Sequence, residues 1–421
     1  MLDLKFIREN IDLVRQNIIN KNEKANVDEI VQLDEKRRQN IQTAQDLKNL
    51  RNVVSKEIAE LKKAKQNADD KISAMKDVSD KIKELDEQLA VIEQSILDIQ
   101  RFIPNMLHSS VPIGKTAEDN IVIRTWGEPK PKIDIDHIEI AKQFGIIDFD
   151  RATKISGSGF AVYTNLGAKL ERALINFFLD HNTNISGYKE VMTPFMVNRE
   201  SMIGTGQIPK LEEDMYKIEN DNFYLIPTAE VPITNLHSNE ILRNDDLPVK
   251  YCGYSPCFRR EAGSYGKDTK GLLRVHQFNK VEMVKFVNPE NSFDELEELV
   301  SDVEKLLQAL GLHYRVILLC SGDTSFSSAK TYDIEVWSPA EQKWLEVSSC
   351  SNFESFQARR ANIRYRPGHD LKPEFVHTLN GSGIATPRIM VALVENYYNG
   401  SEIKIPEVLQ KYTNFDSISK I

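Results

Sequence analysis

The sequence predicts an α+β protein in two parts. Residues 1–105 are expected to form a long antiparallel helical hairpin (a coiled coil), and residues 106–421 a body with a mainly antiparallel sheet flanked by helices. Three observations predict this. From Ile7 to Arg101 the chain has no glycine, proline or aromatic residue, as is typical of long helices. Apolar residues late in that region recur every three or four positions. Beyond Pro104, short runs of alternating apolar and polar residues replace that repeat.

The hairpin is predicted from two apolar seams. The second helix has a heptad repeat that alternates steps of three and four: Met75, Val78, Ile82, Leu85, Leu89, Ile92, Ile96, Ile99 and Ile103. A less regular seam, interrupted by Arg37, Asn40 and Arg51, predicts its partner: Ile30, Leu33, Leu47, Val54, Ile58 and Leu61. The polar stretch 62–71 is expected to turn, which gives two helices of about 50 Å each at about 1.5 Å per residue. The opening segment LKFIRENIDLVRQNI is expected to form one separate, short amphipathic helix.

The two predicted helices differ in charge. Residues 36–65 hold nine Lys or Arg and three acids, a balance of +6, whereas residues 69–98 hold four Lys and nine acids, a balance of −5. One interpretation is that the helices pair electrostatically. The other is that the first helix presents a basic face to nucleic-acid phosphates. Both can hold, because a helix has several faces.

In the body, alternating runs predict antiparallel strands at 222–228, 275–287, 314–320, 331–339 and 343–350. Longer periodic stretches predict helices at 165–182, 290–310 and 383–398. Neither GxxxxGK[ST] nor GxGxxG occurs and no βαβ rhythm repeats, which argues against a P-loop or Rossmann nucleotide site.

Composition limits the class of protein further. The net charge is −9, which argues against non-specific coating of nucleic acid but leaves room for local basic patches. No apolar run approaches the length of a membrane span, and MLDLKFIREN lacks a signal-peptide core, so we expect a cytoplasmic protein without membrane contact. The four cysteines form no CxxC pair or zinc pattern, and they are expected to be reduced thiols.

Four stretches of the body carry the chemistry. TAEVP contains Thr228 and Glu230, and CFRREAGSYGKDTKGLLRVHQF leads from Arg259 and Glu261 to the strand with Glu282. LEVSSCSNFESFQARR contains Glu346 and Ser349, and NGSGIATPR brings Arg388 into a helix. Alone, Glu282 on an alternating strand would favour a solvent-facing side chain. Together, arginines and carboxylates on separate strands suit a substrate that carries both phosphate and ammonium. None of the eight histidines lies in a familiar triad or metal motif, which suits a reaction whose substrates supply the nucleophiles.

These stretches resemble the motifs of the seryl-tRNA synthetases, a family of class II aminoacyl-tRNA synthetases. FRRE with its glycine-rich loop is similar to motif two, GSG…R to motif three, and Pro194 in YKEVMTPFMV to motif one, which forms the homodimer interface in that class. MIGTGQIPKLEEDMYKI, PTAEVPITNLH, KTYDIEVWSP and SSCSNFESFQARR sharpen the likeness. MLDLKFIREN before a long hairpin is typical of bacterial-type members. The resemblance covers essentially the whole chain and implies the class II catalytic fold for residues 106–421.

The resemblance implies a two-step reaction. Serine and ATP give seryl-adenylate and pyrophosphate with the help of Mg²⁺, and serine then passes to the terminal ribose 3′-hydroxyl of tRNA(Ser). It implies a serine site of Thr228, Ala229, Glu230, Glu282 and Ser382. Acceptors around Glu230 would hold the ammonium, and Glu282 would accept from the serine hydroxyl.

For ATP, the resemblance implies a site of Arg259, Arg260, Glu261, Glu346, Val347, Ser348, Ser349 and Arg388. In it Arg259 would hold the α-phosphate, Glu261 the adenine amino group and Arg388 the γ-phosphate, with Glu346 and Ser349 on the metal. Lys267, Lys270 and Arg274 would meet the acceptor end of the tRNA, and the hairpin its long variable arm. No organic cofactor is implied, and a homodimer is expected.

Two departures from the family pattern stand out. Pro387 occupies a position usually held by a small residue, and Thr324 and Ser325 stand where Met-Gly is usual. Proline is tolerated in a first helical turn, because its missing N–H would have no partner there. Two alternatives stay open: a paralogue that activates an amino acid for a carrier protein, and a non-catalytic tRNA-binding protein. Charging of a selenocysteine tRNA, tRNA(Sec), also stays open.

Overall fold

The computed structural model describes residues 1–262 and 270–420. Its contacts separate the chain into two compact units. One contains Leu2–Ile19 and Glu23–Pro104, and the other Met1, Asn20–Asn22 and the chain from Asn105 onward. None of the helices in the described part combines the length and apolarity that a bilayer crossing requires.

The N-terminal unit begins with two short helices where the sequence predicted one. They are α1 (Leu4–Glu9) and α2 (Ile11–Asn20). The break falls at Asn10, whose side-chain amide and backbone N–H both donate to the carbonyl of Phe6, each at 3.0 Å. Asparagine competes with helix continuation in this way through its short polar side chain, so the correction has a local cause.

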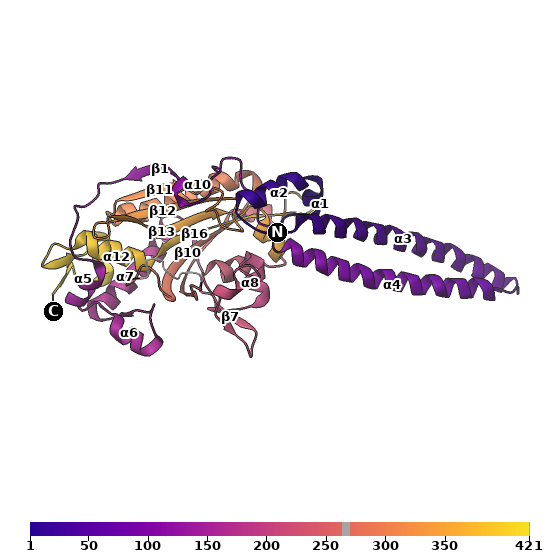
Figure 1. Ribbon diagram of the computed structural model, residues 1–421, viewed down its shortest axis with the longest axis horizontal. Helices are drawn as coiled ribbons and strands as arrows, with labels where there is room; N and C mark the ends of the chain where they lie inside the picture. Colours follow the sequence, from indigo (N-terminus) through magenta and orange to yellow (C-terminus); the bar gives the residue numbers. More distant parts are fainter. Residues whose placement is uncertain (263–269, 421) are drawn as a thin grey trace. The chain divides into compact units, whose positions relative to one another are not determined.

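The predicted hairpin is present as α3 (Val27–Lys63) and α4 (Asp69–Gln100), which run side by side and antiparallel (Figure 1). Residues 64–68 form the turn, inside the predicted stretch. The heptad seam is the buried side of α4, with Ile82, Leu85 and Ile96 each at most 6% exposed. Its partner seam on α3 is half-buried apart from the fully buried Ile30, because the polar interruptions keep that helix less apolar.

The structure confirms electrostatic pairing of the two helices, and the nucleic-acid interpretation stays a prediction. Arg37 of α3 pairs with Glu93 of α4 at 3.0 Å, and Lys48 pairs with Asp86 at 3.1 Å. Several basic residues of this region are instead exposed and make no ion pair within the described residues: Lys36, Lys56, Lys62, Lys63 and Lys65. The hairpin therefore satisfies part of its charge internally and leaves a set of cations in water.

The second unit is built on an eight-stranded sheet (Figure 1). Its strands are antiparallel except for the β4–β9 pair. In spatial order they are β1 (Ile121–Trp126), β11 (Tyr314–Leu318), β12 (Lys330–Ser338), β13 (Lys343–Asn352), β16 (His377–Ala385), β10 (Gln277–Val287), β9 (Val249–Phe258) and β4 (Lys189–Glu190). Four of the five predicted strands are confirmed as β10, β11, β12 and β13. The fifth, 222–228, is shortened to β7 (Phe223–Leu225) in a separate three-stranded sheet.

The core of this unit lies on one face of the large sheet. Three helices cover that face, each close to a predicted range: α7 (Asn165–Asn184), α10 (Ser292–Ala309) and α12 (Thr386–Tyr397). Alternate residues of the strands point into this core, among them Val281 and Met283 of β10 and Ile334 of β12, all fully buried. The other face of the same strands carries polar side chains beside a smaller apolar cluster, which includes Val284 and Phe286 of β10.

Smaller elements surround the sheet. The helices are α5 (His137–Gln143), α6 (Phe149–Ser156), α8 (Arg199–Thr205), α9 (Glu230–Asn235), α11 (Phe356–Ala361) and α13 (Glu407–Thr413). The strands are β2 (Ile147–Asp148), β3 (Val162–Tyr163), β5 (Met196–Asn198), β6 (Lys217–Ile218), β8 (Ile241–Arg243), β14 (Arg364–Arg366), β15 (Glu374–Phe375), β17 (Glu402–Lys404) and β18 (Ser417–Ser419).

Lys21 binds the backbone of loop 325–328, which lies far away from it in the sequence. The residue is 4% exposed, and its ammonium donates to the carbonyls of Ser325 at 2.8 Å, Phe326 at 3.3 Å and Ser328 at 2.7 Å. The Asn105 amide donates to the carbonyl of Ser327 at 3.0 Å. Two distant residues thus hold the backbone of loop 325–328, which lines the cavity described next.

Candidate active site

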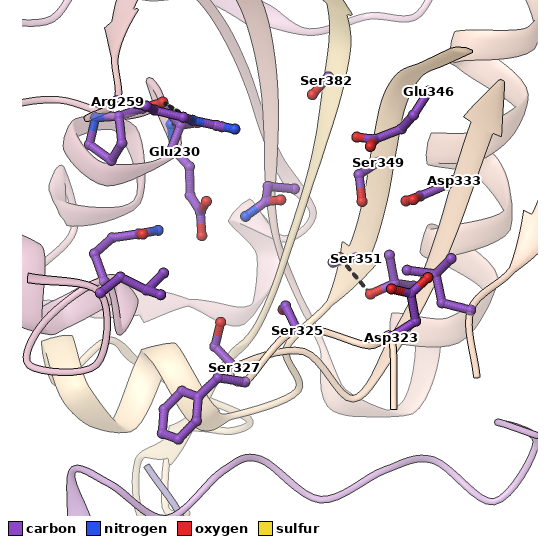
Figure 2. A pocket seen from close by; sticks show the side chains of 18 of the residues that line it. Glu230, Arg259, Asp323, Ser325, Ser327, Asp333, Glu346, Ser349, Ser351 and Ser382 are labelled. Atoms are coloured by element: carbon purple, nitrogen blue, oxygen red, sulfur yellow. Dashed lines mark hydrogen bonds between the residues drawn. The ribbon is translucent and has the colours of Figure 1, made fainter. Parts of the chain in front are cut away.

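The polar face of the sheet forms the floor of a cavity of about 800 Å³. On β12, alternation brings Thr331, Asp333 and Glu335 to this face, while the residues between them enter the core. On β10 the same rule brings Lys280 and Glu282 to it. Figure 2 shows residues of these strands and of the surrounding loops converging on one space. The face opposite the core is therefore the candidate active site.

A β-bulge decides which residues of β13 reach the cavity. The pairing with β12 runs from Ile334 opposite Ser348 to Glu335 opposite Glu346, so Val347 is an extra residue. Strict alternation would place Glu346 and Ser349 on opposite faces. The extra residue brings both onto the cavity face, as bulges commonly do when they redirect a side chain.

One end of the cavity gathers the residues predicted for serine. Thr228, Glu230, Glu282 and Ser382 all line it, and Glu282 lies directly opposite Ser382 in the strand pairing. The Thr228 hydroxyl lies 3.2 Å from Glu282 Oε2. Glu282 is 2% exposed, so its alternating strand position does not make it solvent-facing.

Glu230 lies in the same end of the cavity and is held by Gln357 of α11. The Gln357 amide donates to Glu230 Oε1 at 2.6 Å and to the carbonyl of Thr205 at 3.2 Å, and its oxygen accepts from Thr378 at 2.7 Å. Burial, and then the negative charge of Glu282, raise the pKa of Glu230 to about 7. Above that pH the Glu230 carboxyl group is ionised and can pair with the ammonium of a ligand.

The same cavity also gathers residues predicted for ATP. Arg259 lines the cavity, its Nε donates to the carbonyl of Pro227 at 3.2 Å, and its guanidinium lies 5.1 Å from the centre of the Phe278 ring. Glu261 forms an ion pair with Arg274, and both line the cavity. These two arginines and one carboxylate give the cavity fixed groups that can recognise phosphate and a base edge.

Arg388 enters from the first turn of α12, next to Pro387. It does not line the cavity itself. Its guanidinium donates to the carbonyl of Glu346 at 2.7 Å and to the carboxylate of that residue at 3.2 Å. The first turn of α12 thus accommodates Pro387, as predicted. Arg388 contacts Glu346, which is one of the candidate metal ligands.

Three oxygen donors fit a magnesium ion. The Glu346 carboxylate and the Ser349 hydroxyl share the cavity face with Asp333, and Figure 2 shows the three close together. Asp333 Oδ1 is buried and has no hydrogen-bond partner among the described residues. Burial and the charge of Glu346 raise the pKa of Asp333 well above its usual range. Oxygen donors of this kind suit Mg²⁺, which also keeps waters and phosphate oxygens.

Several predicted residues lie elsewhere. Ala229, Val347 and Ser348 are buried in the packing beneath the cavity rather than among its lining residues. Arg260 donates to the carbonyl of Glu213 at 3.0 Å, and the exposed Lys270 is also away from the lining. Lys267 lies outside the described residues. Of the predicted residues that the structure describes, nine line the cavity, and these five and Arg388 do not.

The structure also adds residues that the sequence interpretation missed. Lys280, Asp333 and Gln357 contact predicted site residues or share the cavity with them. Lys280 precedes Glu282 by two on a predicted strand, and Asp333 lies in a predicted alternating strand, so same-face placement could have revealed both. Gln357 gave no comparable indication, because its contact with Glu230 joins residues 127 positions apart.

This fold and cavity define a class II aminoacyl-tRNA synthetase core, and residues 214–397 match the family model described as tRNA synthetase class II core domain (G, H, P, S and T). Residues 1–107 match the seryl-tRNA synthetase N-terminal domain. The chain is 54% identical to a serine–tRNA ligase of Chloroherpeton thalassium, with 99% of this chain and 100% of the relative covered. It is 53% identical to one of Carboxydothermus hydrogenoformans, with complete coverage of both. The chain belongs to the serine–tRNA ligase family.

Solved structures agree with this assignment. The crystal structure of seryl-tRNA synthetase from Pyrococcus horikoshii complexed with ATP matches with a TM-score of 0.94 and 39% identity, over 100% of both chains. The cytoplasmic serine–tRNA ligase from Naegleria fowleri in complex with AMP matches with a TM-score of 0.90 and 29% identity, over 100% of this chain and 99% of that one. The predicted fold class is confirmed.

Proposed function

We propose that this chain activates L-serine with ATP and transfers it to tRNA(Ser). The observation that carries the proposal is the union of two sets of residues in one cavity: Glu230, Glu282 and Ser382 for serine, and Arg259, Glu346 and Ser349 for ATP. A serine ammonium and hydroxyl suit the first set, and a triphosphate with its metal ion suits the second. The family membership supports this assignment.

In the first step, a serine carboxylate oxygen forms a bond to the α-phosphorus of ATP while the bond to the β-phosphate oxygen breaks. Pyrophosphate leaves and seryl-adenylate remains. Arg259 places a fixed guanidinium where negative charge accumulates on the α-phosphate. Glu230 and Glu282 orient serine, so much of the catalysis is positioning. Glu346, Ser349 and Asp333 would hold a magnesium ion, which neutralises phosphate charge when bound.

In the second step, the terminal ribose 3′-hydroxyl of tRNA bonds to the serine carbonyl carbon. The bond from that carbon to the phosphate oxygen breaks, the hydroxyl proton is lost and AMP leaves. Lys270 and Arg274 come just after residues 263–269, in the sequence region of motif two. We propose that they contact the acceptor end of the tRNA together with Lys267. The exposed lysines of the hairpin are proposed to meet the variable arm, and the chain is proposed to work as a homodimer.

One experiment tests the function. Serine, and none of the other nineteen standard amino acids at comparable concentration, should support rapid ATP–pyrophosphate exchange, and the same protein should charge tRNA(Ser). No serine-dependent exchange would overturn the proposal. Exchange without charging of any tRNA would favour transfer to a carrier protein, which the hairpin and its matching family model disfavour. A non-catalytic role would predict loss of Arg259, Glu261, Glu346 or Arg388, and all four are present.

Charging of tRNA(Sec) is a separate question that the same purified protein can answer. If the hairpin recognises a long variable arm by its phosphates, it should tolerate both tRNAs. Parallel charging reactions with tRNA(Ser) and tRNA(Sec) measure this directly.

A further inference from the structure

The serine end of the cavity contains a third charged residue to which the proposed mechanism gives no role. Lys280 is 6% exposed, beside Glu282 at 2% and Glu230 at 8%. It lies two positions before Glu282 on β10, so both side chains leave the strand on the cavity face. Lys280 forms a close ion pair with Glu282. Burying a lysine destabilises the fold unless its charge is paired, so the placement of Lys280 needs a functional explanation.

The hydrogen bonds around Thr228 show how this ion pair is held. A threonine hydroxyl has one hydrogen and two lone pairs. Its oxygen accepts from the Lys280 ammonium at 3.0 Å and from the backbone N–H of Glu230 at 3.2 Å, and both of these groups can only donate. Its one hydrogen is therefore left for Glu282 Oε2 at 3.2 Å. That oxygen accepts from Thr228 and also faces the Lys280 ammonium, so both contacts favour negative charge on this carboxyl group.

The charges at this end then sum to a definite value. The ammonium of Lys280 cancels the carboxylate of Glu282. Glu230 is held by the neutral amide of Gln357, so its charge is not cancelled by that contact. When Glu230 is ionised, these three residues together carry a single net negative charge. That charge matches the one ammonium of a neutral-side-chain amino acid.

We propose that Lys280 is a specificity-determining residue, which cancels the charge of Glu282 so that the pocket accepts a neutral side-chain hydroxyl and rejects a side-chain cation. The proposal rests on the proposed function, in which Glu282 accepts from the serine hydroxyl. With Lys280 in place, Glu282 offers a strong acceptor without net attraction for a second cation. Without Lys280, the same carboxylate would attract one.

The discriminating probe is L-2,3-diaminopropionate, the analogue of serine in which an amine replaces the hydroxyl. It is nearly the same size as serine but brings a cation to Glu282 when its side chain is protonated. The test compares kcat/KM for ATP–pyrophosphate exchange with serine and with this analogue. The wild-type chain, Lys280→Met and a matched control, Lys285→Met, are measured in parallel.

Lys285 is a suitable control because it lies on the same strand but on the other face. It is fully buried, and it pairs with Glu295 at 2.8 Å, away from the cavity. Loss of a buried lysine from β10 is thus common to both variants, whereas only Lys280→Met removes the cation beside Glu282. Thermal melting with and without ATP shows that each variant folds and keeps the nucleotide end.

Lys280→Met should lower kcat/KM for serine by about 10- to 100-fold, the range expected when a hydrogen bond to a charged group is lost. The ratio of diaminopropionate to serine should rise at least about tenfold for the same reason. Lys285→Met should leave the ratio unchanged. An unchanged ratio in folded Lys280→Met would overturn the proposal, while a wild-type chain without serine-dependent exchange would overturn the proposed function itself.

A double variant keeps the test decisive if Lys280→Met does not fold. Lys280→Met combined with Glu282→Gln removes both charges and returns the net charge to that of the wild type. It should fold, activate serine weakly and show no preference for the diamine. A double variant that favours the diamine as strongly as the single variant would place the cause elsewhere than in the charge of Glu282, and would overturn the proposal.

Discussion

Glu230 and Glu282 are two carboxyl groups of one pocket with different surroundings. Glu282 forms an ion pair with Lys280 and accepts a hydrogen bond from the Thr228 hydroxyl, whereas Glu230 accepts one from the Gln357 amide. The pKa of Glu230 is raised to about 7, so the residue is largely protonated below that pH and a carboxylate above it. Since an ammonium pairs with the carboxylate, the two states differ in their affinity for serine.

Serine binding should therefore strengthen as the pH rises through 7. The KM for serine in pyrophosphate exchange should be roughly tenfold higher at pH 6 than at pH 8, because about one tenth of a group with a pKa near 7 is ionised at pH 6. The charged neighbours that face Glu230 are Glu282 and Lys280. Glu230→Gln should bind serine weakly and abolish the dependence. A KM for serine that stays constant between pH 6 and pH 8 in the wild type would contradict this assignment.

Glu282 is expected to distinguish serine from alanine. A polar pocket rejects a substrate without the hydroxyl because its buried acceptor would stay unpaired. Glu282→Ala should reduce the serine-to-alanine ratio of kcat/KM at least about tenfold, which corresponds to one hydrogen bond to a charged group. Glu335→Ala, which changes another cavity carboxylate that pairs with Arg315 at 2.5 Å, serves as the control and should preserve the ratio.

At this scale the sequence predicted residue types better than positions. The predicted carboxylates and Arg259 share one cavity, because strand alternation and loop placement are local properties. Ser349 joins Glu346 only through the bulge at Val347, which depends on pairing with a different strand. Gln357 reaches Glu230 through the packing of α11, and no spacing in the sequence encodes that contact.

Among the elements, the hairpin offers the clearest separation of functions. Its base contains contacts that hold the N-terminal unit together: Arg8 pairs with the buried Asp34 at 2.8 Å, and the Gln100 amide donates to the carbonyl of Leu2 at 2.7 Å. Its outer part contains most of the unpaired lysines. A truncation that removes the outer part can therefore leave the base intact.

Replacing residues 41–88 by a short turn should leave serine-dependent pyrophosphate exchange within about twofold, because independent sites contribute additively. Charging of tRNA(Ser) should fall by at least about 100-fold as phosphate contacts are lost. The triple variant Lys56→Glu, Lys62→Glu and Lys63→Glu should lower charging in a salt-dependent way. The same reversal at Lys76, Lys81 and Lys83 on α4 is the control. Equal loss of exchange and charging in the truncated protein would refute this division of labour.

The sequence predicted the long elements well, because their apolar repeats persist over many turns. It missed the break between α1 and α2, which depends on hydrogen bonds at a single asparagine. It also overextended the strand at 222–228, whose end turns away to place Thr228 in the cavity. These errors lie where short polar groups compete with regular structure.

For the whole molecule, the open question is assembly. Around Pro194 the chain exposes large apolar side chains, with Met192 84% exposed and Met196 51% exposed. Exposed apolar clusters of this kind mark interaction surfaces. They support the proposed homodimer, in which this segment would be covered by the second copy.

Met192→Asp combined with Met196→Asp should therefore shift the protein from dimer to monomer in sedimentation at micromolar concentration. A buried charge without a partner is unfavourable in an interface. Val91→Asp, at a side chain that is 68% exposed on the hairpin, is the control and should leave the mass unchanged. A double variant that sediments as the wild type does would move the interface away from this segment.

The hold of Lys21 on loop 325–328 has a consequence for the order of synthesis. The Lys21 ammonium binds the carbonyl of Ser325, which is synthesised 304 residues later. At about 5–20 residues per second, the ribosome needs roughly 15–60 seconds to make this stretch. A nascent chain that stops before Ser325 already contains Thr228, Glu230 and Glu282. It lacks β12 and β13, which supply a large part of the cavity floor. The cavity is thus completed only late in translation, after β12 and β13 have been made and Lys21 can bind loop 325–328.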